Sequence, residues 1–118
     1  MDKELFNVAV YGTLKAGHGN NRLLQNSRMI GEGWIHGYKM VASGIPFVFK
    51  DEDVDSKVWV EVWQVDGPTL ANLDSLEGHP DWYYRSPVDV HTEGGGMQAE
   101  VYLNDQHNEL PEVVGGVY

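Results

Sequence analysis

The chain has 118 residues, which is enough for one domain with a single hydrophobic core and too few for two. Eighteen Asp and Glu residues against eight Lys and Arg residues give a formal net charge of −10, and so acidic a protein repels nucleic-acid backbones and anionic membranes. The sequence has no cysteine, which excludes disulfide bonds and thiolate chemistry. We therefore expect a single domain over residues 1–118 with no nucleic-acid and no membrane partner.

The location of the protein is predicted from what the sequence lacks. The opening segment, MDKELFNVAV, has neither the basic start nor the long apolar run of a signal peptide. No apolar stretch approaches the roughly 20 residues that a membrane-spanning helix needs. A cytoplasmic location is the expectation.

The amino-terminal region is predicted to form a strand, a loop and a short helix. Residues 5–11 are apolar and β-prone apart from Asn7, which indicates a buried strand. The strand runs directly into a Tyr-Gly-Thr-Leu turn at residues 11–14. A short helix over residues 22–27 follows, and Asn20 or Asn21 is placed to cap it.

Residues 31–41 are predicted to form one long strand. Its alternate side chains share one face: Trp34, His36, Tyr38 and Met40. Two glycines within it, Gly33 and Gly37, indicate bends or bulges. A shorter strand is expected over residues 43–49.

Residues 57–65 give the clearest strand in the sequence. Valines occupy one face: Val58, Val60 and Val62. Trp59, Glu61 and Trp63 occupy the other. Tryptophans in strands are mostly core residues, so we expect Trp34, Trp59 and Trp63 to pack in the core and Trp82 to be the exposed one.

A helix is predicted between Asp66 and Gly78. Asp66 or Gly67 is suited to the N-cap, Pro68 to the first turn and Gly78 to the position just after the helix. Its apolar stripe consists of Leu70, Leu73 and Leu76.

Glu77 lies on the edge of this apolar stripe, seven residues after Leu70 and four after Leu73. Burial and the helix C-terminus both disfavour a carboxylate there, and both raise its pKa toward the range of a general base. The alternative is that a frayed helix end turns Glu77 toward solvent.

Two further strands, over residues 83–91 and 97–103, are predicted to form a hairpin, and the tail after them is mostly irregular. About six strands and one or two short helices in so short a chain indicate an α+β fold with a small, nearly closed sheet.

Metal binding is not expected. The five histidines lack the close spacing of a metal site. Asp51, Asp53 and Asp55 are spaced as in a calcium loop, but Ser56 replaces the required glycine, so an acidic surface turn is expected.

These motifs, taken together and in order, resemble the gamma-glutamylcyclotransferase-like family over almost the whole chain. The resemblance is carried by Tyr11-Gly12-Thr13-Leu14, Gly44-Ile45-Pro46, the strand from Val58 to Trp63, Leu73-Asp74-Ser75-Leu76-Glu77-Gly78 and Tyr83-Tyr84-Arg85. It implies a small mixed β-barrel with flanking helices. It also implies a cofactor-free cyclotransferase of the gamma-glutamylamine type that releases 5-oxoproline from a γ-glutamyl amine or peptide.

The resemblance also implies roles for individual residues. Glu77 matches the catalytic glutamate, and Tyr83 matches a tyrosine near the pocket. The turn that grips the γ-glutamyl group is matched by Tyr11, Gly12, Thr13 and Leu14. Arg85 is expected to be structural, pairing with a carboxylate or with carbonyl groups.

Several alternatives stay open at this point. The rival to an enzyme is a non-catalytic module on the same fold, which binds a small ligand or docks a partner. Glu61 either lines the pocket or forms hydrogen bonds at its rim, and His79 either tunes the pKa of Glu77 or is a solvated loop residue. The leaving amine and the oligomeric state are not determined by the sequence.

Overall fold

A computed structural model describes residues 4–53 and 55–118 of the chain. The elements in chain order are β1 (Leu5–Val10), the 3-10 helix η1 (Asn21–Leu24), β2 (Arg28–His36), β3 (Tyr38–Ser43), β4 (Ile45–Lys50), β5 (Lys57–Asp66), α1 (Gly67–Glu77), β6 (Tyr84–Thr92) and β7 (Gly95–Leu103).

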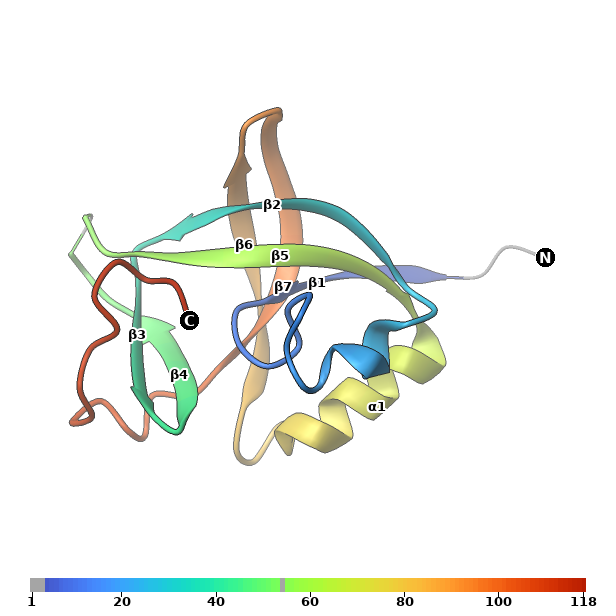
Figure 1. The fold of residues 1–118 in the computed structure, drawn as a ribbon. Helices are drawn as coiled ribbons and strands as arrows, with labels where there is room; N and C mark the ends of the chain where they lie inside the picture. The colour runs from blue at the N-terminus through green and yellow to red at the C-terminus, as the bar shows by residue number, and fades with distance from the viewer. Residues whose placement is uncertain (1–3, 54) are drawn as a thin grey trace.

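Five of these strands close into a barrel in the order β1-β5-β2-β6-β7 (Figure 1). The barrel is mixed, because β1 pairs with β7 in parallel whereas its other adjacent strands pair antiparallel to each other. The remaining strands, β3 and β4, form a separate antiparallel sheet beside one end of the barrel. The predicted small mixed β-barrel with short helices is confirmed, with seven strands described in place of about six.

Alternate side chains of β5 fill the barrel, as the sequence predicts. Val58, Val60 and Val62 are completely buried in one core cluster, whereas Trp59 on the opposite face is partly exposed. Trp59 packs edge-on against Trp34 with 5.0 Å between ring centroids. The expectation that these two tryptophans belong to the core is wrong, because the narrow interior is already filled by valines and the indoles lie on the outer surface.

The predicted single strand over residues 31–41 is also wrong. Gly37 has a φ of +80° and separates β2 from β3, which belong to different sheets. As a result Tyr38 is buried in the same cluster as Ile35, whereas His36 is exposed. A positive φ is open to glycine at little cost, and at this position it switches which alternate residues face the core.

The helix α1 begins and ends where the sequence predicts. The side chain of Asp66 accepts a hydrogen bond from the backbone N–H of Thr69 at 2.9 Å, and Gly78 adopts the left-handed conformation with a φ of +65°. Leu70 and Leu73 are buried, but Leu76 is 40% exposed. Within the described residues, neither this helix nor η1 has the length and apolar character to span a membrane.

The predicted cap of the second helix is not formed. Asn20 stands at the N-cap position of η1, but its side chain makes no capping hydrogen bond. It binds instead to Thr13, and Asn21 binds to the carbonyl oxygen of Leu14. Both asparagines therefore support the turn that follows β1.

Candidate active site

A cavity of about 210 Å³ lies where the end of β1 meets the start of β4 and the end of α1. A water molecule needs only about 10–15 Å³ of such space, so the cavity has room for a small organic molecule. The six residues predicted from the sequence all line it: Tyr11, Gly12, Thr13, Leu14, Glu77 and Tyr83. Their roles in binding and catalysis stay predictions.

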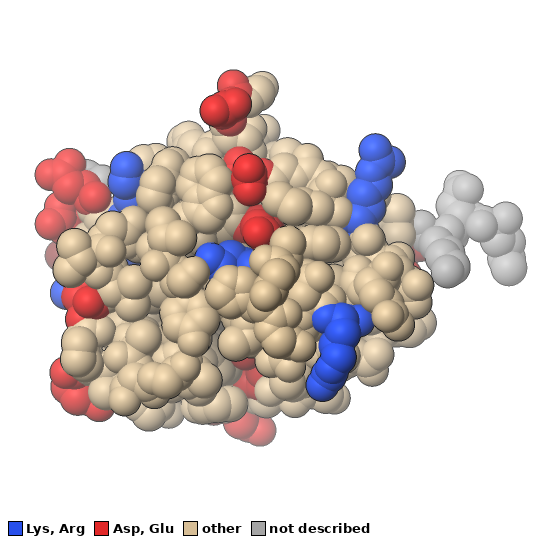
Figure 2. Space-filling view, viewed as in Figure 1, with Lys and Arg blue, Asp and Glu red and all other residues tan. Residues whose placement is uncertain are grey.

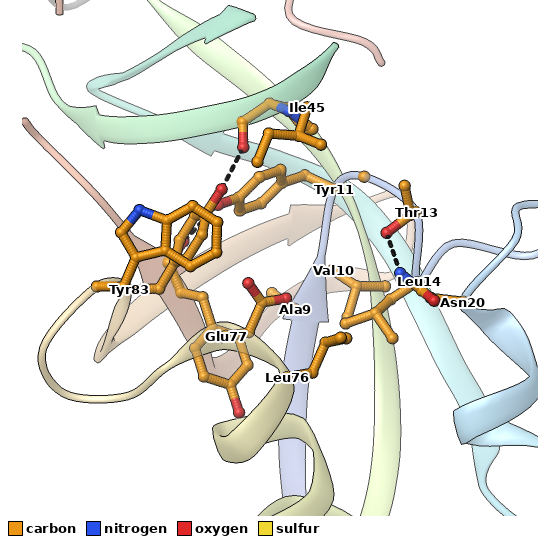
Figure 3. A pocket seen from close by; sticks show the side chains of 14 residues that line it. Ala9, Val10, Tyr11, Thr13, Leu14, Asn20, Ile45, Leu76, Glu77 and Tyr83 are labelled. Atoms are coloured by element: carbon orange, nitrogen blue, oxygen red, sulfur yellow. Dashed lines mark hydrogen bonds between the residues drawn. The ribbon is translucent and has the colours of Figure 1, made fainter. Parts of the chain in front are cut away.

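Glu77 points into this cavity, toward the end of β1 (Figure 3). Within the part of the chain that the structure describes, no cation and no hydrogen-bond donor contacts its carboxyl group. Burial raises the pKa of Glu77 from its ordinary 4.5 to about 7. The alternative of a solvated glutamate at a frayed helix end is therefore not what the structure shows.

Within the described residues, no hydrogen bond or ion pair joins His79 to Glu77. Its Nδ1 accepts a hydrogen bond from the backbone N–H of Arg85 at 3.2 Å. Burial by itself accounts for the raised pKa of Glu77, and His79 fixes the path of the loop between α1 and β6.

In the turn after β1 the carbonyl oxygens accept hydrogen bonds, whereas three N–H groups have no acceptor within the described residues. The carbonyl of Gly12 accepts from the N–H of Lys15 at 3.0 Å, and that of Thr13 from the N–H of Asn20 at 2.9 Å. The carbonyl of Leu14 accepts from the side chain of Asn21 at 2.8 Å. Among the described residues, no acceptor is bonded to the N–H groups of residues 12, 13 and 14. Successive free N–H groups in a turn bind anions.

Gly12 allows the turn to approach β4 closely. A Cβ atom at this position would lie 2.7 Å from Cγ of Pro46, which is closer than real contacts allow. Behind the turn, Oε1 of Glu61 accepts from the N–H of Ala16 at 2.8 Å and from the indole of Trp63 at 3.1 Å. Of the two alternatives for Glu61, the structure supports hydrogen bonding at the rim.

The tyrosines of the site are held by carbonyl groups. The hydroxyl of Tyr83 donates to the carbonyl of Pro46 at 2.8 Å, and that of Tyr11 donates to the carbonyl of Tyr102 at 2.6 Å. Burial, with the nearby Glu77 adding to it, raises the pKa of both Tyr11 and Tyr83. Both raised pKa values favour the neutral hydroxyl, and each hydroxyl is held by its carbonyl partner.

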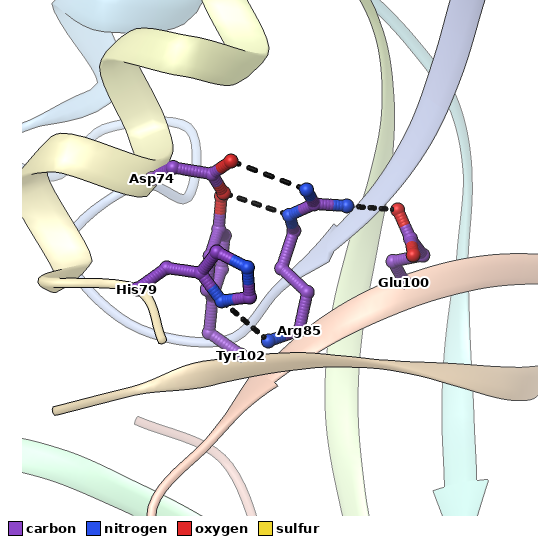
Figure 4. A network of polar contacts seen from close by, with 5 residues as sticks. All are labelled: Asp74, His79, Arg85, Glu100 and Tyr102. Carbon is purple, nitrogen blue, oxygen red and sulfur yellow. Dashed lines mark hydrogen bonds and ion pairs between the residues drawn. The ribbon is translucent and has the colours of Figure 1, made fainter. Parts of the chain in front are cut away.

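A polar network fixes the end of α1 to the barrel (Figure 4). Asp74 accepts from Nε of Arg85 at 2.7 Å and from the hydroxyl of Tyr102 at 2.6 Å. Arg85 also binds Glu100 at 2.6 Å, so the predicted structural pairing of Arg85 is confirmed. Burial acts to raise the pKa of Asp74, but the bonds from Arg85 and Tyr102 outweigh it and lower that pKa. Asp74 and Tyr102 were not predicted as part of the site, because no sequence pattern links residues 28 positions apart.

The mouth of the cavity is apolar. Ile45, Leu76 and Trp82 come from three different parts of the chain, line the cavity, and are each about 40% exposed. Single exposed apolar side chains are common, but a group of them around one opening indicates a binding surface. The exposure predicted for Trp82 is confirmed.

Charged side chains are unevenly distributed on the face of the molecule that Figure 2 presents. Figure 2 shows acidic and basic side chains spread around a broad uncharged area on the face that it presents. Over residues 4–53 and 55–118, no group of three or more His, Cys, Asp or Glu side chains is arranged to hold a metal ion.

Comparison with known proteins gives the family. The sequence profile of the family described as gamma-glutamyl cyclotransferase, AIG2-like, matches residues 8–118. The chain belongs to this family. The resemblance inferred from the motifs is thereby confirmed, and the family's named members are cyclotransferase enzymes.

Individual relatives support the same family assignment. A Methanocaldococcus jannaschii protein that carries a provisional gamma-glutamylcyclotransferase name is 41% identical over 98 residues, covering 81% of this chain and 80% of that protein. The gamma-glutamylaminecyclotransferase of Bos taurus is 36% identical over 106 residues, covering 80% of this chain but only 63% of its own length. The crystal structure of an AIG2-like protein from Mus musculus superposes with a TM-score of 0.85 at 26% identity, over 98% of this chain and 88% of that one.

Proposed function

We propose that this protein cleaves a γ-glutamyl amine or peptide by intramolecular attack of the substrate's α-amine, releasing 5-oxoproline and the free amine. The observation that carries the proposal is the partly buried carboxyl group of Glu77, with a pKa raised to about 7. It shares its cavity with a turn whose three N–H groups bind no acceptor among the described residues. A proton acceptor and an anion-binding turn are the two groups that this ring closure requires.

The reaction begins with proton transfer. The substrate's α-ammonium group gives a proton to the Glu77 carboxylate, and the neutral amine attacks the γ-carbonyl carbon of the same molecule. Because the attack is intramolecular, the cavity needs mainly to hold the glutamyl chain in a folded shape. The new C–N bond opens the carbonyl, and its oxygen becomes an oxyanion.

The second step breaks the old amide bond. The oxyanion closes again to a carbonyl while the bond to the leaving nitrogen breaks, and protonated Glu77 gives its proton to that nitrogen. The attacking nitrogen loses a second proton, which the leaving amine takes up to depart as an ammonium ion. Protons balance, and Glu77 returns to its carboxylate form.

The turn at residues 12–14 supplies fixed donors for negative charge. Its free N–H groups are suited to the glutamyl α-carboxylate or to the oxyanion of the tetrahedral intermediate. Fixed donors that bind such an oxyanion raise the rate by about 10²–10³ in other enzymes.

The leaving amine would lie at the apolar mouth. The described residues that line the cavity include no Lys, Arg or His, so a free carboxylate on the leaving group would find no cation there. Ile45, Leu76 and Trp82 favour an apolar substituent. We therefore expect γ-glutamyl amides of alkyl or aryl amines to react faster than γ-glutamyl amino acids.

The test is release of 5-oxoproline, measured by mass spectrometry with three substrates: the γ-glutamyl amides of benzylamine, of a lysine side chain and of alanine. Glu77→Gln should lower kcat/KM by about 10²–10⁴, and the matched control Glu93→Gln, an exposed hairpin residue, should leave it unchanged. Since the base acts as a carboxylate, kcat/KM should fall as the pH drops below about 7.

Other results would count against the enzyme. If no substrate gives 5-oxoproline and yet 5-oxoproline or a γ-glutamyl amide binds, the protein is a ligand-binding module. If the protein neither releases 5-oxoproline nor binds 5-oxoproline or a γ-glutamyl amide, the remaining interpretation is a module that docks a partner.

A further inference from the structure

The carboxy-terminal strap, defined as residues 111–118, lies across β3 and β5. The N–H of Ala42 donates to the carbonyl of Pro111, and the N–H of Trp59 donates to the carbonyl of Gly116. Gly116 has a φ of +71°, and a Cβ atom there would collide with the carbonyl oxygen of Lys57. The strap is thus packed directly on the barrel, and Tyr118 follows this fixed point by two residues.

Tyr118 connects two walls of the cavity. Its main-chain oxygen accepts from Nζ of Lys15 at 2.6 Å, next to the turn at residues 12–14. Its hydroxyl donates to the carbonyl of Gly44 at 2.9 Å, immediately before the cavity-lining Ile45 and Pro46. Its ring lies about 4.0 Å from where a Cβ of Gly12 would be. Tyr118 itself does not line the cavity.

Lys15 makes this connection costly to break. The side chain is only 6% exposed, and the negative charge of Glu61 acts on it from a distance. Within the described residues, Nζ donates a hydrogen bond to no acceptor other than the main-chain oxygen of Tyr118. A buried ammonium group that loses its acceptor carries a large desolvation cost. The bond between Lys15 and Tyr118 therefore resists separation of the strap from the turn.

We propose that Tyr118 is a positioning residue, which locks the turn at residues 12–15 to the turn between β3 and β4 and so fixes the binding cavity. Within the described residues it makes no hydrogen bond or ion pair with Glu77, so we expect it to act on substrate binding and not on the proton acceptor. The catalytic effect rests on the proposed function, but the mechanical effect does not.

The first test is independent of activity. Amide hydrogen exchange measured by NMR should show that Tyr118→Ala lowers the protection of the N–H groups of Lys15 and Asn20, which close the turn, by about 10-fold or more. Tyr118→Phe, which loses only the bond to Gly44, should lower it by about 2–5-fold. Tyr84→Phe removes a tyrosine hydroxyl elsewhere, on β6, and should change nothing.

The second test reads the consequence for substrate. Tyr118→Ala and Lys15→Met should each lower kcat/KM by about 10-fold or more, mainly through KM, without moving the pH of half-maximal activity near 7 that Glu77 sets. Lys50→Met, an exposed lysine on β4, is the matched control for Lys15→Met. A purely structural role would lower the amount of active enzyme and leave KM alone.

The outcomes separate the two proposals. Unchanged protection at Lys15 and Asn20 in Tyr118→Phe and Lys15→Met overturns the positioning role, whatever the activity of the wild type. Loss of protection there in the variants, together with a wild type that releases no 5-oxoproline, supports the positioning role and overturns the proposed reaction. If Tyr118→Ala fails to fold, Tyr118→Phe decides.

Discussion

Asp74 and Glu77 are carboxyl groups one helical turn apart on α1, yet their surroundings are opposite. Asp74 receives hydrogen bonds from Arg85 and Tyr102, and its pKa is lowered. Glu77 receives none from the described residues, and its pKa is raised to about 7. The comparison shows that two carboxyl groups at one helix end can have opposite pKa shifts, because Asp74 has a cation and a hydroxyl donor beside it and Glu77 has neither among the described residues.

The hydrogen bonds of Asp74 also hold the part of α1 that carries Glu77. Asp74 ties the last turn of α1 to Arg85 on β6 and to Tyr102 on β7, and the N–H of Tyr83 donates to the carbonyl of Glu77 at 3.1 Å. With both sides of the helix end fixed, the Glu77 side chain is held in the cavity although the charged form is unfavourable there.

The largest expected effect is a change of the free energy of unfolding with pH, and it tests the contrast between Asp74 and Glu77. A pKa raised from 4.5 to about 7 means that folding favours the protonated carboxyl. Its contribution is fully present below pH 4.5 and is lost as the pH rises through about 7, up to about 3 kcal/mol. Measured by urea unfolding, the wild type should lose this much relative to Glu77→Gln between pH 4.5 and pH 8. Glu93→Gln should follow the wild type, and parallel curves for wild type and Glu77→Gln would contradict the buried carboxyl.

The next effect breaks the anchored carboxylate. Asp74→Asn removes the charge that pairs with Arg85, and since the pair is only partly buried, we expect a loss of about 1–3 kcal/mol in the free energy of unfolding at pH 7. This is the opposite sign from Glu77→Gln at pH 8. The exposed Asp89→Asn on β6 is the matched control. Equal stability of Asp74→Asn and the wild type would show that the network does not anchor α1.

The smallest effect removes one bond of the network. Tyr102→Phe takes away the hydroxyl that donates to Asp74 at 2.6 Å while leaving the backbone carbonyl that accepts from Tyr11. We expect a loss of about 1–2 kcal/mol by urea unfolding, since the acceptor is charged, with Tyr84→Phe as the control. In the double variant with Asp74→Asn the losses should not add, because the two residues share one interaction. Additive losses in the free energy of unfolding would show that Tyr102 and Asp74 do not share one interaction.

The sequence by itself determined most of the strands, the limits of α1, and the motifs that give the family. These are local properties: alternation in residues 57–65, an Asp cap and a Gly after the helix act within a few residues. The same local reading placed Glu77 on the edge of the apolar stripe, next to the Leu70 side of the helix.

The tertiary structure decided what those elements do to one another. The turn at Gly37 directs Tyr38 into the core, and the filled barrel leaves Trp34 and Trp59 on its outer side. Neither result can be predicted from local periodicity. The partners of Asp74 and the contacts of Tyr118 join residues 11 to 103 positions apart. The raised pKa of Glu77 likewise comes from exclusion of water by distant segments, because desolvation depends on where the chain packs and not on which residues are adjacent in sequence.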